Sequence, residues 1–133
     1  MQLSVSVRNA RLDAFESAIG ADAIMKIRTG AAPASCATAD SGTVLATLNL
    51  PSDWMAAASG GTKAKSGTWE DAEADAAGVA AHFRIYASDG TTCHAQGTIT
   101  ATGGGGELTL NNTNIALGQP IEITGFTLTE PGA

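Results

Sequence analysis

The sequence predicts a mainly β fold, an antiparallel β-sandwich or barrel-like domain with one N-terminal amphipathic helix. Roughly seven or eight short segments alternate apolar and polar residues, as half-buried strands do. Glycine-rich turns separate these segments, and one early segment has helical periodicity instead. The chain has 133 residues and no internal repeat. We therefore expect a single β-rich domain over 1–133, with an N-terminal arm and helix over 1–20 and a β-sandwich over 24–133.

The first elements are a short strand and the helix. Residues 3–7 alternate apolar and polar, which predicts a strand. Arg8–Ile19 is predicted to be helical because its apolar residues recur at helical spacing: Leu12, Phe15, Ala18 and Ile19. Gly20 follows at the position of a C-terminal cap.

The next segments predict two strands joined by a loop. Ile24–Thr29 reads as a strand with Ile27 facing the core and Lys26 and Arg28 facing solvent. Residues 30–42 are small and polar and predict a loop, and residues 43–50 alternate again until Pro51. The acidic, alanine-rich residues 70–75 predict an exposed loop.

A hairpin is the clearest local signal. Residues 79–87 and 91–101 flank Ser88-Asp89-Gly90, and three-residue hairpin loops commonly place glycine last. This loop puts apolar residues opposite one another on one face and polar residues on the other, whereas a two-residue loop would mix the faces. The apolar pairs are Ile85 with Cys93, Phe83 with Ala95, Ala81 with Gly97 and Val79 with Ile99. The polar pairs are Tyr86 with Thr92, Arg84 with His94 and His82 with Gln96.

The C-terminal third predicts two more strands. A glycine turn at 103–106 leads to a short strand at 108–110. Ile121–Thr129 reads as a single last strand, in which the apolar phase shifts at Gly125 and so indicates a β-bulge.

Composition excludes several functional classes. The net charge is −6, so phosphate-driven nucleic-acid binding is not expected. The apolar runs are too short to span a membrane, and residues 1–4 lack the basic and apolar regions of a secretory signal. No general acid, base and nucleophile come together in the pattern, and the glycine turn lacks the Gly-Lys-Ser/Thr of a phosphate loop. We expect no enzyme activity and no cofactor.

The polar face of the hairpin is the candidate site. We expect it to be an exterior surface that contacts other proteins, because Tyr, Arg and His are suited to interfaces. Its residues are His82, Arg84, Tyr86, His94 and Gln96. The two histidines have no carboxylate at a fixed offset on this face, so no metal site is expected.

The two cysteines leave two alternatives open. Cys36 and Cys93 lie far apart, and without a secretory signal two reduced thiols are the default. A single Cys36–Cys93 bridge is the alternative if the protein works outside a cell. The hairpin register places Cys93 in the core, pointing away from His94, so these neighbours do not form a nucleophile pair.

Four stretches resemble small structural proteins encoded by tailed phages and prophages. They are the run 7–13, the run 26–33, the hairpin 82–90 and the C-terminal segment 108–129. The resemblance covers most of the chain and carries no catalytic motif. It implies a β-rich virion protein, assembled in the host cytoplasm, that binds the major capsid protein or other virion proteins as a dimer or trimer. Capsid decoration (cement) is the first hypothesis. Alternatives are a neck, tail or fibre-associated role, a carbohydrate- or receptor-binding module and, last, an enzyme.

Overall fold

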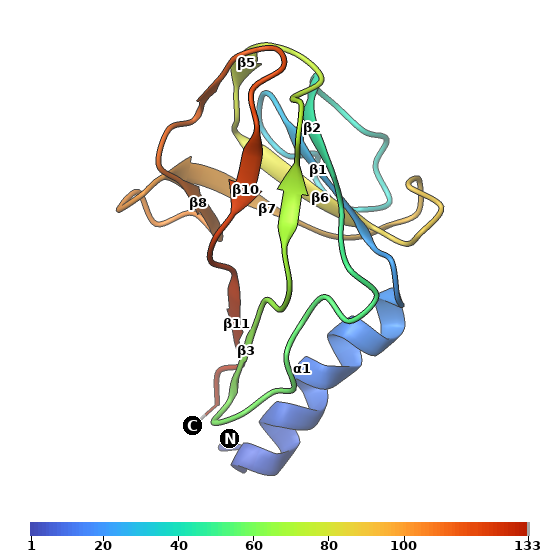
Figure 1. Ribbon diagram of the computed structural model, residues 1–133. Helices are drawn as coiled ribbons and strands as arrows, with labels where there is room; N and C mark the ends of the chain where they lie inside the picture. The colour runs from blue at the N-terminus through green and yellow to red at the C-terminus, as the bar shows by residue number, and fades with distance from the viewer. Residues whose placement is uncertain (133) are drawn as a thin grey trace.

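The computed structural model describes residues 1–132 and confirms the mainly β class with one N-terminal helix, α1 (Val5–Ile19) (Figure 1). Eleven strands follow the helix in the described part of the chain. They are β1 (Ile24–Arg28), β2 (Val44–Asn49), β3 (Thr62–Ala64), β4 (Trp69–Asp71), β5 (Gly78–Val79), β6 (His82–Tyr86), β7 (Cys93–Ala101), β8 (Leu108–Leu110), β9 (Asn114–Ile115), β10 (Ile121–Ile123) and β11 (Thr127–Thr129). No helix within residues 1–132 is long and apolar enough to cross a membrane.

Helix α1 starts three residues earlier than the sequence predicts. The Ser4 hydroxyl accepts a hydrogen bond from the Val7 amide, so Ser4 caps the helix and the expected strand at 3–7 does not form. Gly20 is confirmed at the C-terminal cap, with φ at +92°. The Leu3 amide, before the helix, donates to the Gly132 carbonyl at 2.7 Å. Leu3, in the expected N-terminal arm, is therefore held against the segment that contains Gly132.

A buried lysine joins α1 to the strands. Lys63 of β3 is nearly fully buried, and its ammonium lies 2.7 Å from Asp13 and 3.0 Å from Glu16 on the helix. The desolvation of Lys63 acts to lower its pKa, but its bonds to these two carboxylates outweigh that effect and raise it. The polar side of the helix thus contacts the rest of the molecule through ion pairs, beside the apolar contacts of Leu12 and Ile19.

The main sheet has the strand order β2-β1-β6-β7-β8. β1 pairs antiparallel with β2 and β6, and β6 pairs antiparallel with β7 in the expected hairpin. β8, however, pairs parallel with β7, with Ile99 opposite Leu108. The glycine-rich connection between them returns the chain to the level of Ile99, so that β8 runs in the same direction as β7. Gly103 (φ +89°) and Gly105 (φ +83°) adopt the left-handed conformations that this path contains. The purely antiparallel arrangement is therefore wrong at this strand.

Residues 121–129 form two strands instead of one. β10 pairs with β4, and β11 pairs with β3, so the two pairs continue one another along a ribbon (Figure 1). The chain changes partner around Gly125, where the buried positions shift from Ile121 and Ile123 to Phe126. The phase shift seen in the sequence thus marks a break between strands and not a bulge within one. The expected acidic loop is also partly wrong, because it begins inside β4 and its Ala74 is buried.

A row of aromatic rings fills the core between the ribbon and the sheet. The ring centroids of Trp54 and Trp69 are 5.9 Å apart, those of Trp69 and Phe126 are 5.4 Å apart, and those of Phe126 and Phe83 are 5.8 Å apart. Both indole N–H groups are satisfied, since Trp54 donates to the Gly20 carbonyl and Trp69 donates to the Trp54 carbonyl. The few large side chains are therefore concentrated in the core.

The hairpin does not keep its predicted register, and it keeps its predicted faces only from Ala95 onward. Ile85 lies opposite Ala95 and Phe83 opposite Gly97, two residues away from the expected pairs. The connection is longer than three residues, because the Ala87 amide donates to the Thr92 carbonyl and the ladder shifts at Tyr86. A shift of two leaves the side chains from Ala95 onward on their original faces, whereas Cys93, beyond the irregularity, lies opposite Tyr86 on the polar face. Val79 is not part of this hairpin at all, since it lies in β5 and is 54% exposed.

Candidate functional site

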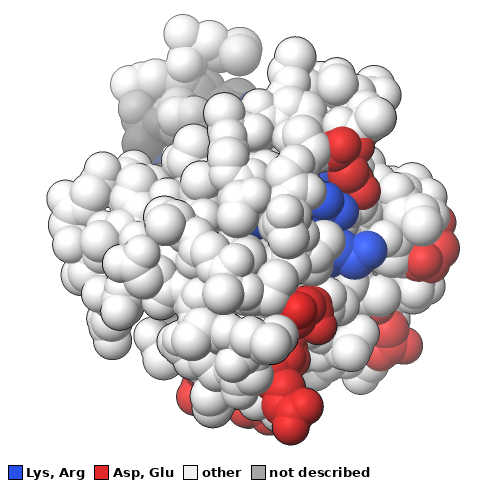
Figure 2. All heavy atoms as spheres, turned by 90° about the horizontal axis from the view of Figure 1, so that it is seen from above, with Lys and Arg blue, Asp and Glu red and all other residues white. Residues whose placement is uncertain are grey.

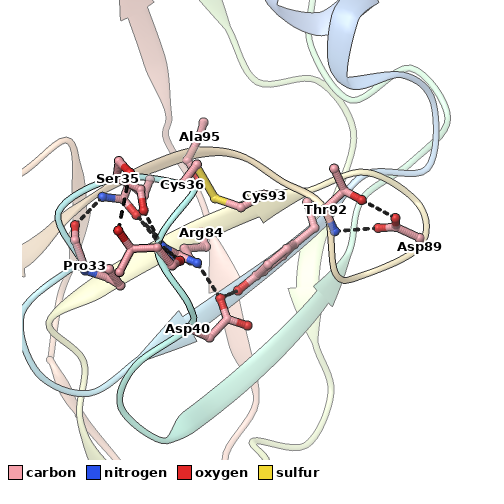
Figure 3. Close-up of a disulfide and its surroundings, with 12 residues drawn as sticks. Pro33, Ser35, Cys36, Asp40, Arg84, Asp89, Thr92, Cys93 and Ala95 are labelled. Atoms are coloured by element: carbon pink, nitrogen blue, oxygen red, sulfur yellow. Dashed lines mark hydrogen bonds and ion pairs between the residues drawn. A yellow bond between two sulfur atoms is a disulfide. The ribbon is translucent and has the colours of Figure 1, made fainter.

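The polar face of β6 is buried and not exterior as the sequence predicts. Residues 30–42, which we call the covering loop, pass over it between β1 and β2 (Figure 3). His82 and Tyr86 are 0% exposed and Arg84 is 2% exposed. Apolar–polar alternation shows which face is polar but not whether water or another segment covers it. The expectation of an exterior contact surface at these residues is therefore wrong.

Asp40 of the covering loop is the centre of a charge network whose two arginines are buried. One of its carboxylate oxygens accepts hydrogen bonds from Arg84 Nη1 at 2.6 Å and from the Tyr86 hydroxyl at 2.8 Å. The other accepts from Arg28 Nη2 at 2.9 Å. Arg28 was expected to face solvent, but its side chain is only 7% exposed. Two buried guanidinium groups thus share a single carboxylate.

These contacts set the ionisation of the network. Burial acts to raise the pKa of Asp40, but hydrogen bonds from Tyr86 and Arg84 and the charges of Arg28 and Arg84 outweigh it, so the pKa lies below its ordinary value. Burial, followed by the hydrogen bond to Asp40, raises the pKa of Tyr86. At neutral pH the site therefore holds a carboxylate, two guanidinium groups and a neutral phenol.

The remaining donors of Arg84 organise the backbone of the covering loop. Its Nη2 donates to the Ser35 carbonyl at 2.9 Å and to the Thr38 carbonyl at 3.0 Å. Its Nε donates to Gln96 Oε1 at 3.1 Å, and the Gln96 amide in turn donates to the Pro33 carbonyl at 2.6 Å. A buried guanidinium with satisfied donors can hold an irregular segment in one conformation. Arg84 and Gln96 are therefore organising residues of the loop.

The two histidines lie in different environments. His82 Nδ1 donates to the Gly30 carbonyl at 2.7 Å, and its buried Nε2 has no hydrogen-bond partner. His94 is exposed. Of the five residues expected at a contact surface, the structure brings His82, Arg84, Tyr86 and Gln96 together beneath the covering loop and leaves His94 outside.

A disulfide between Cys36 and Cys93 fastens the covering loop to the start of β7 (Figure 3). The Cα atoms are 5.2 Å apart and the residues are 57 positions apart in sequence. The structure therefore contains the bridged alternative and not the default of two reduced thiols. Cys93 lies on the loop side of the sheet, so its expected place in the core is wrong. Closing a loop of this length stabilises the folded state by about 4 kcal/mol in the chain-entropy description.

The outer surface of the covering loop is small and uncharged. Its exposed side chains before Asp40 are Ala31, Ala34, Ser35, Ala37, Thr38 and Ala39. Figure 2 shows the molecule from above, with uncharged residues over most of the visible face and acidic side chains gathered along one side. Polar groups below and a disulfide hold the loop, so its outer face is a fixed surface with little side-chain entropy to lose.

Sequence reasoning missed Arg28 and Asp40 as members of the site. One signal could have found them, because Asp40 is the only acidic residue in 30–42, the segment that directly follows the strand carrying Arg28. Within residues 1–132, no group of three or more His, Cys, Asp or Glu side chains is placed to hold a metal ion. No family model, curated protein or solved structure matches this chain.

Proposed function

We propose that this protein is a structural component of a tailed-phage particle, most simply a capsid decoration (cement) protein that binds the major capsid protein and stabilises the shell. The order of motifs along most of the chain supports the proposal through its resemblance to such proteins. The observation that carries it is the Cys36–Cys93 disulfide. Disulfides persist in oxidising, extracellular surroundings, which is where a released particle must survive.

The covering loop supplies a surface for this role. Its exposed alanines allow close approach to a flat partner, and alanine loses no rotamer freedom when it is buried. The disulfide and the Asp40 network hold the loop in place before binding, which lowers the entropic cost of association. In this proposal the chain acts without catalysis, assembles in the host cytoplasm and binds the shell as a dimer or trimer. The net charge of −6 is unfavourable for contact with the packaged genome, so this role is on the outside of the shell.

A neck, tail or fibre-associated role is the alternative within the same particle. Copy number separates the two, because a decorated shell carries many copies and a neck ring few. A carbohydrate-binding module is less well supported, since sugars commonly stack on exposed aromatic rings. Trp54, Trp69 and Tyr86 are all fully buried.

Co-sedimentation with shells that lack the protein tests the proposal. The wild-type protein should bind such shells, and Ala37→Arg should weaken binding because it puts a long charged side chain on the covering loop. Ala14→Arg is the matched control, since Ala14 is exposed on α1, away from the loop. A stable monomer that does not bind the shells would contradict the decoration role. Loss of binding in the Ala14 variant but not in the Ala37 variant would place the contact on the helix instead.

A further inference from the structure

The main sheet is continued around the molecule by the β4–β10 pair. Its β2 edge is covered by residues 71–75, because the Thr47 amide donates to the Asp71 carboxylate at 2.9 Å and the Asp75 amide donates to the Leu45 carbonyl at 2.7 Å. β4, which ends at Asp71, then pairs with β10. Passing around the molecule, β8, β7, β6, β1 and β2 are therefore followed by β4 and β10.

The circuit is open between β8 and β10. Each is the last strand of its sheet, and within residues 1–132 no strand pairing joins them. A cavity of about 290 Å³ lies at this opening, and a second of about 180 Å³ adjoins it. We call the opening the β8/β10 groove, and it is lined by Thr109, Leu110 and Asn111 on one side and by Glu122 and Thr124 on the other.

The side chains along the groove follow a two-residue period. Leu108 and Leu110 of β8 are buried, as are Ile121 and Ile123 of β10. Thr109 and Glu122, between them, are exposed. A strand placed in the groove would therefore need apolar side chains toward the core and a polar one between Thr109 and Glu122.

The acidic residues beside the groove indicate which polar side chain of an added strand would fit there. Glu122 lies directly opposite Glu70 in the β4–β10 pair, and both side chains are exposed. Like charges at opposed positions of an antiparallel pair are destabilising. A lysine or arginine beside Glu122 would offset this repulsion and pair with the one charged residue that lines the groove.

We propose that the β8/β10 groove accepts an extended segment of a partner polypeptide as an added strand. The open strand edges supply backbone donors and acceptors for pairing, as in other cases of strand addition. The segment recognised has apolar residues on either side of a basic one.

Peptide titration of the intact, disulfide-bonded protein tests the proposal by NMR. The probe is the capped pentapeptide Thr-Val-Lys-Val-Thr. One control, Thr-Val-Glu-Val-Thr, reverses its charge, and another, Thr-Pro-Lys-Pro-Thr, removes two backbone donors. We expect the lysine peptide to shift the amides of 108–111 and 121–124 and to bind more tightly than either control.

Charge reversal in the protein is the second part of the test. Glu122→Lys removes the opposition to Glu70, so the variant should fold. It should bind the lysine peptide about five-fold more weakly, as expected for loss of one exposed ion pair, and should favour the glutamate peptide. Glu73→Lys, at an exposed site outside the groove, should bind as the wild type does.

Three results would overturn the proposal. They are the absence of shifts at millimolar peptide, equal binding of the proline peptide, and shifts away from the groove. Concentration-dependent shifts at 108–111 and 121–124 without peptide would assign the groove to a second copy of the chain and would also overturn it.

Discussion

Replacing Asp40 by asparagine tests the buried network most sharply. Asparagine has nearly the same shape but no charge, so Arg28 and Arg84 lose the one carboxylate that they share. Removing one partner of a buried ion pair costs about 3–5 kcal/mol. The Asp40 side chain is 37% exposed, so water replaces part of the lost interaction, and we expect a loss of about 2–3 kcal/mol. For a chain of this size that corresponds to about 7–11 °C in Tm.

The assay is denaturant unfolding of the disulfide-intact protein, followed by the fluorescence of the buried Trp54 and Trp69. Asp53→Asn is the matched control, because Asp53 is exposed and the variant makes the same charge change. An Asp40→Asn variant as stable as the Asp53→Asn control would refute the assignment of Asp40 as the counter-charge of the two arginines.

The same variant has a predicted pH dependence. The pKa of Asp40 is lowered in the folded state, so its contribution to stability is fully present above the ordinary aspartate pKa of about 3.9 and is lost as pH falls through the folded value. The stability difference between the wild type and Asp40→Asn should therefore be constant near neutral pH and shrink below about pH 4. A difference that grows on acidification would contradict this sign.

Three further predictions concern the cross-link, the core and the hairpin. Alkylation of the denatured, unreduced protein should label neither Cys36 nor Cys93, and reduction should lower stability by about 4 kcal/mol; two labelled thiols would exclude the bridge. Phe83→Ala should destabilise the fold by about 3–5 kcal/mol in the same unfolding assay, and a change near zero would contradict its place in the core. The Asp89 carboxyl should titrate with a pKa of about 2 by NMR, chiefly because the carboxylate accepts hydrogen bonds from the Thr92 hydroxyl and amide. An ordinary pKa near 4 would mean that these hydrogen bonds are absent in solution.

The strands of the main sheet were largely predictable from sequence because alternation and glycine turns are local signals. β1, β2 and β6 appear close to their expected positions, and Gly20 ends the helix as expected. The hairpin register was not predictable, because the Asp89 carboxylate bonds the amides of Thr91 and Thr92 and stabilises a longer connection.

The candidate site was only half predictable. The sequence groups five residues on one polar face, and the structure brings four of them together on the covered side of the sheet and leaves out His94: the four are His82, Arg84, Tyr86 and Gln96. The sequence does not show that residues 30–42 fold back over this face, because that contact depends on hydrogen bonds between residues 44 or more positions apart. The parallel β7–β8 pair is likewise a tertiary result, since the glycines that permit it would also suit an ordinary hairpin.

Quantitative mass spectrometry of purified phage particles tests the central functional claim most directly. The decoration role predicts that this chain is present in a copy number comparable to that of the major capsid protein, with Cys36 and Cys93 recovered as a disulfide-linked peptide pair. Absence of the chain from the particles would contradict a virion role altogether. Recovery at only a few copies per particle would contradict shell decoration and assign the protein to the neck or tail.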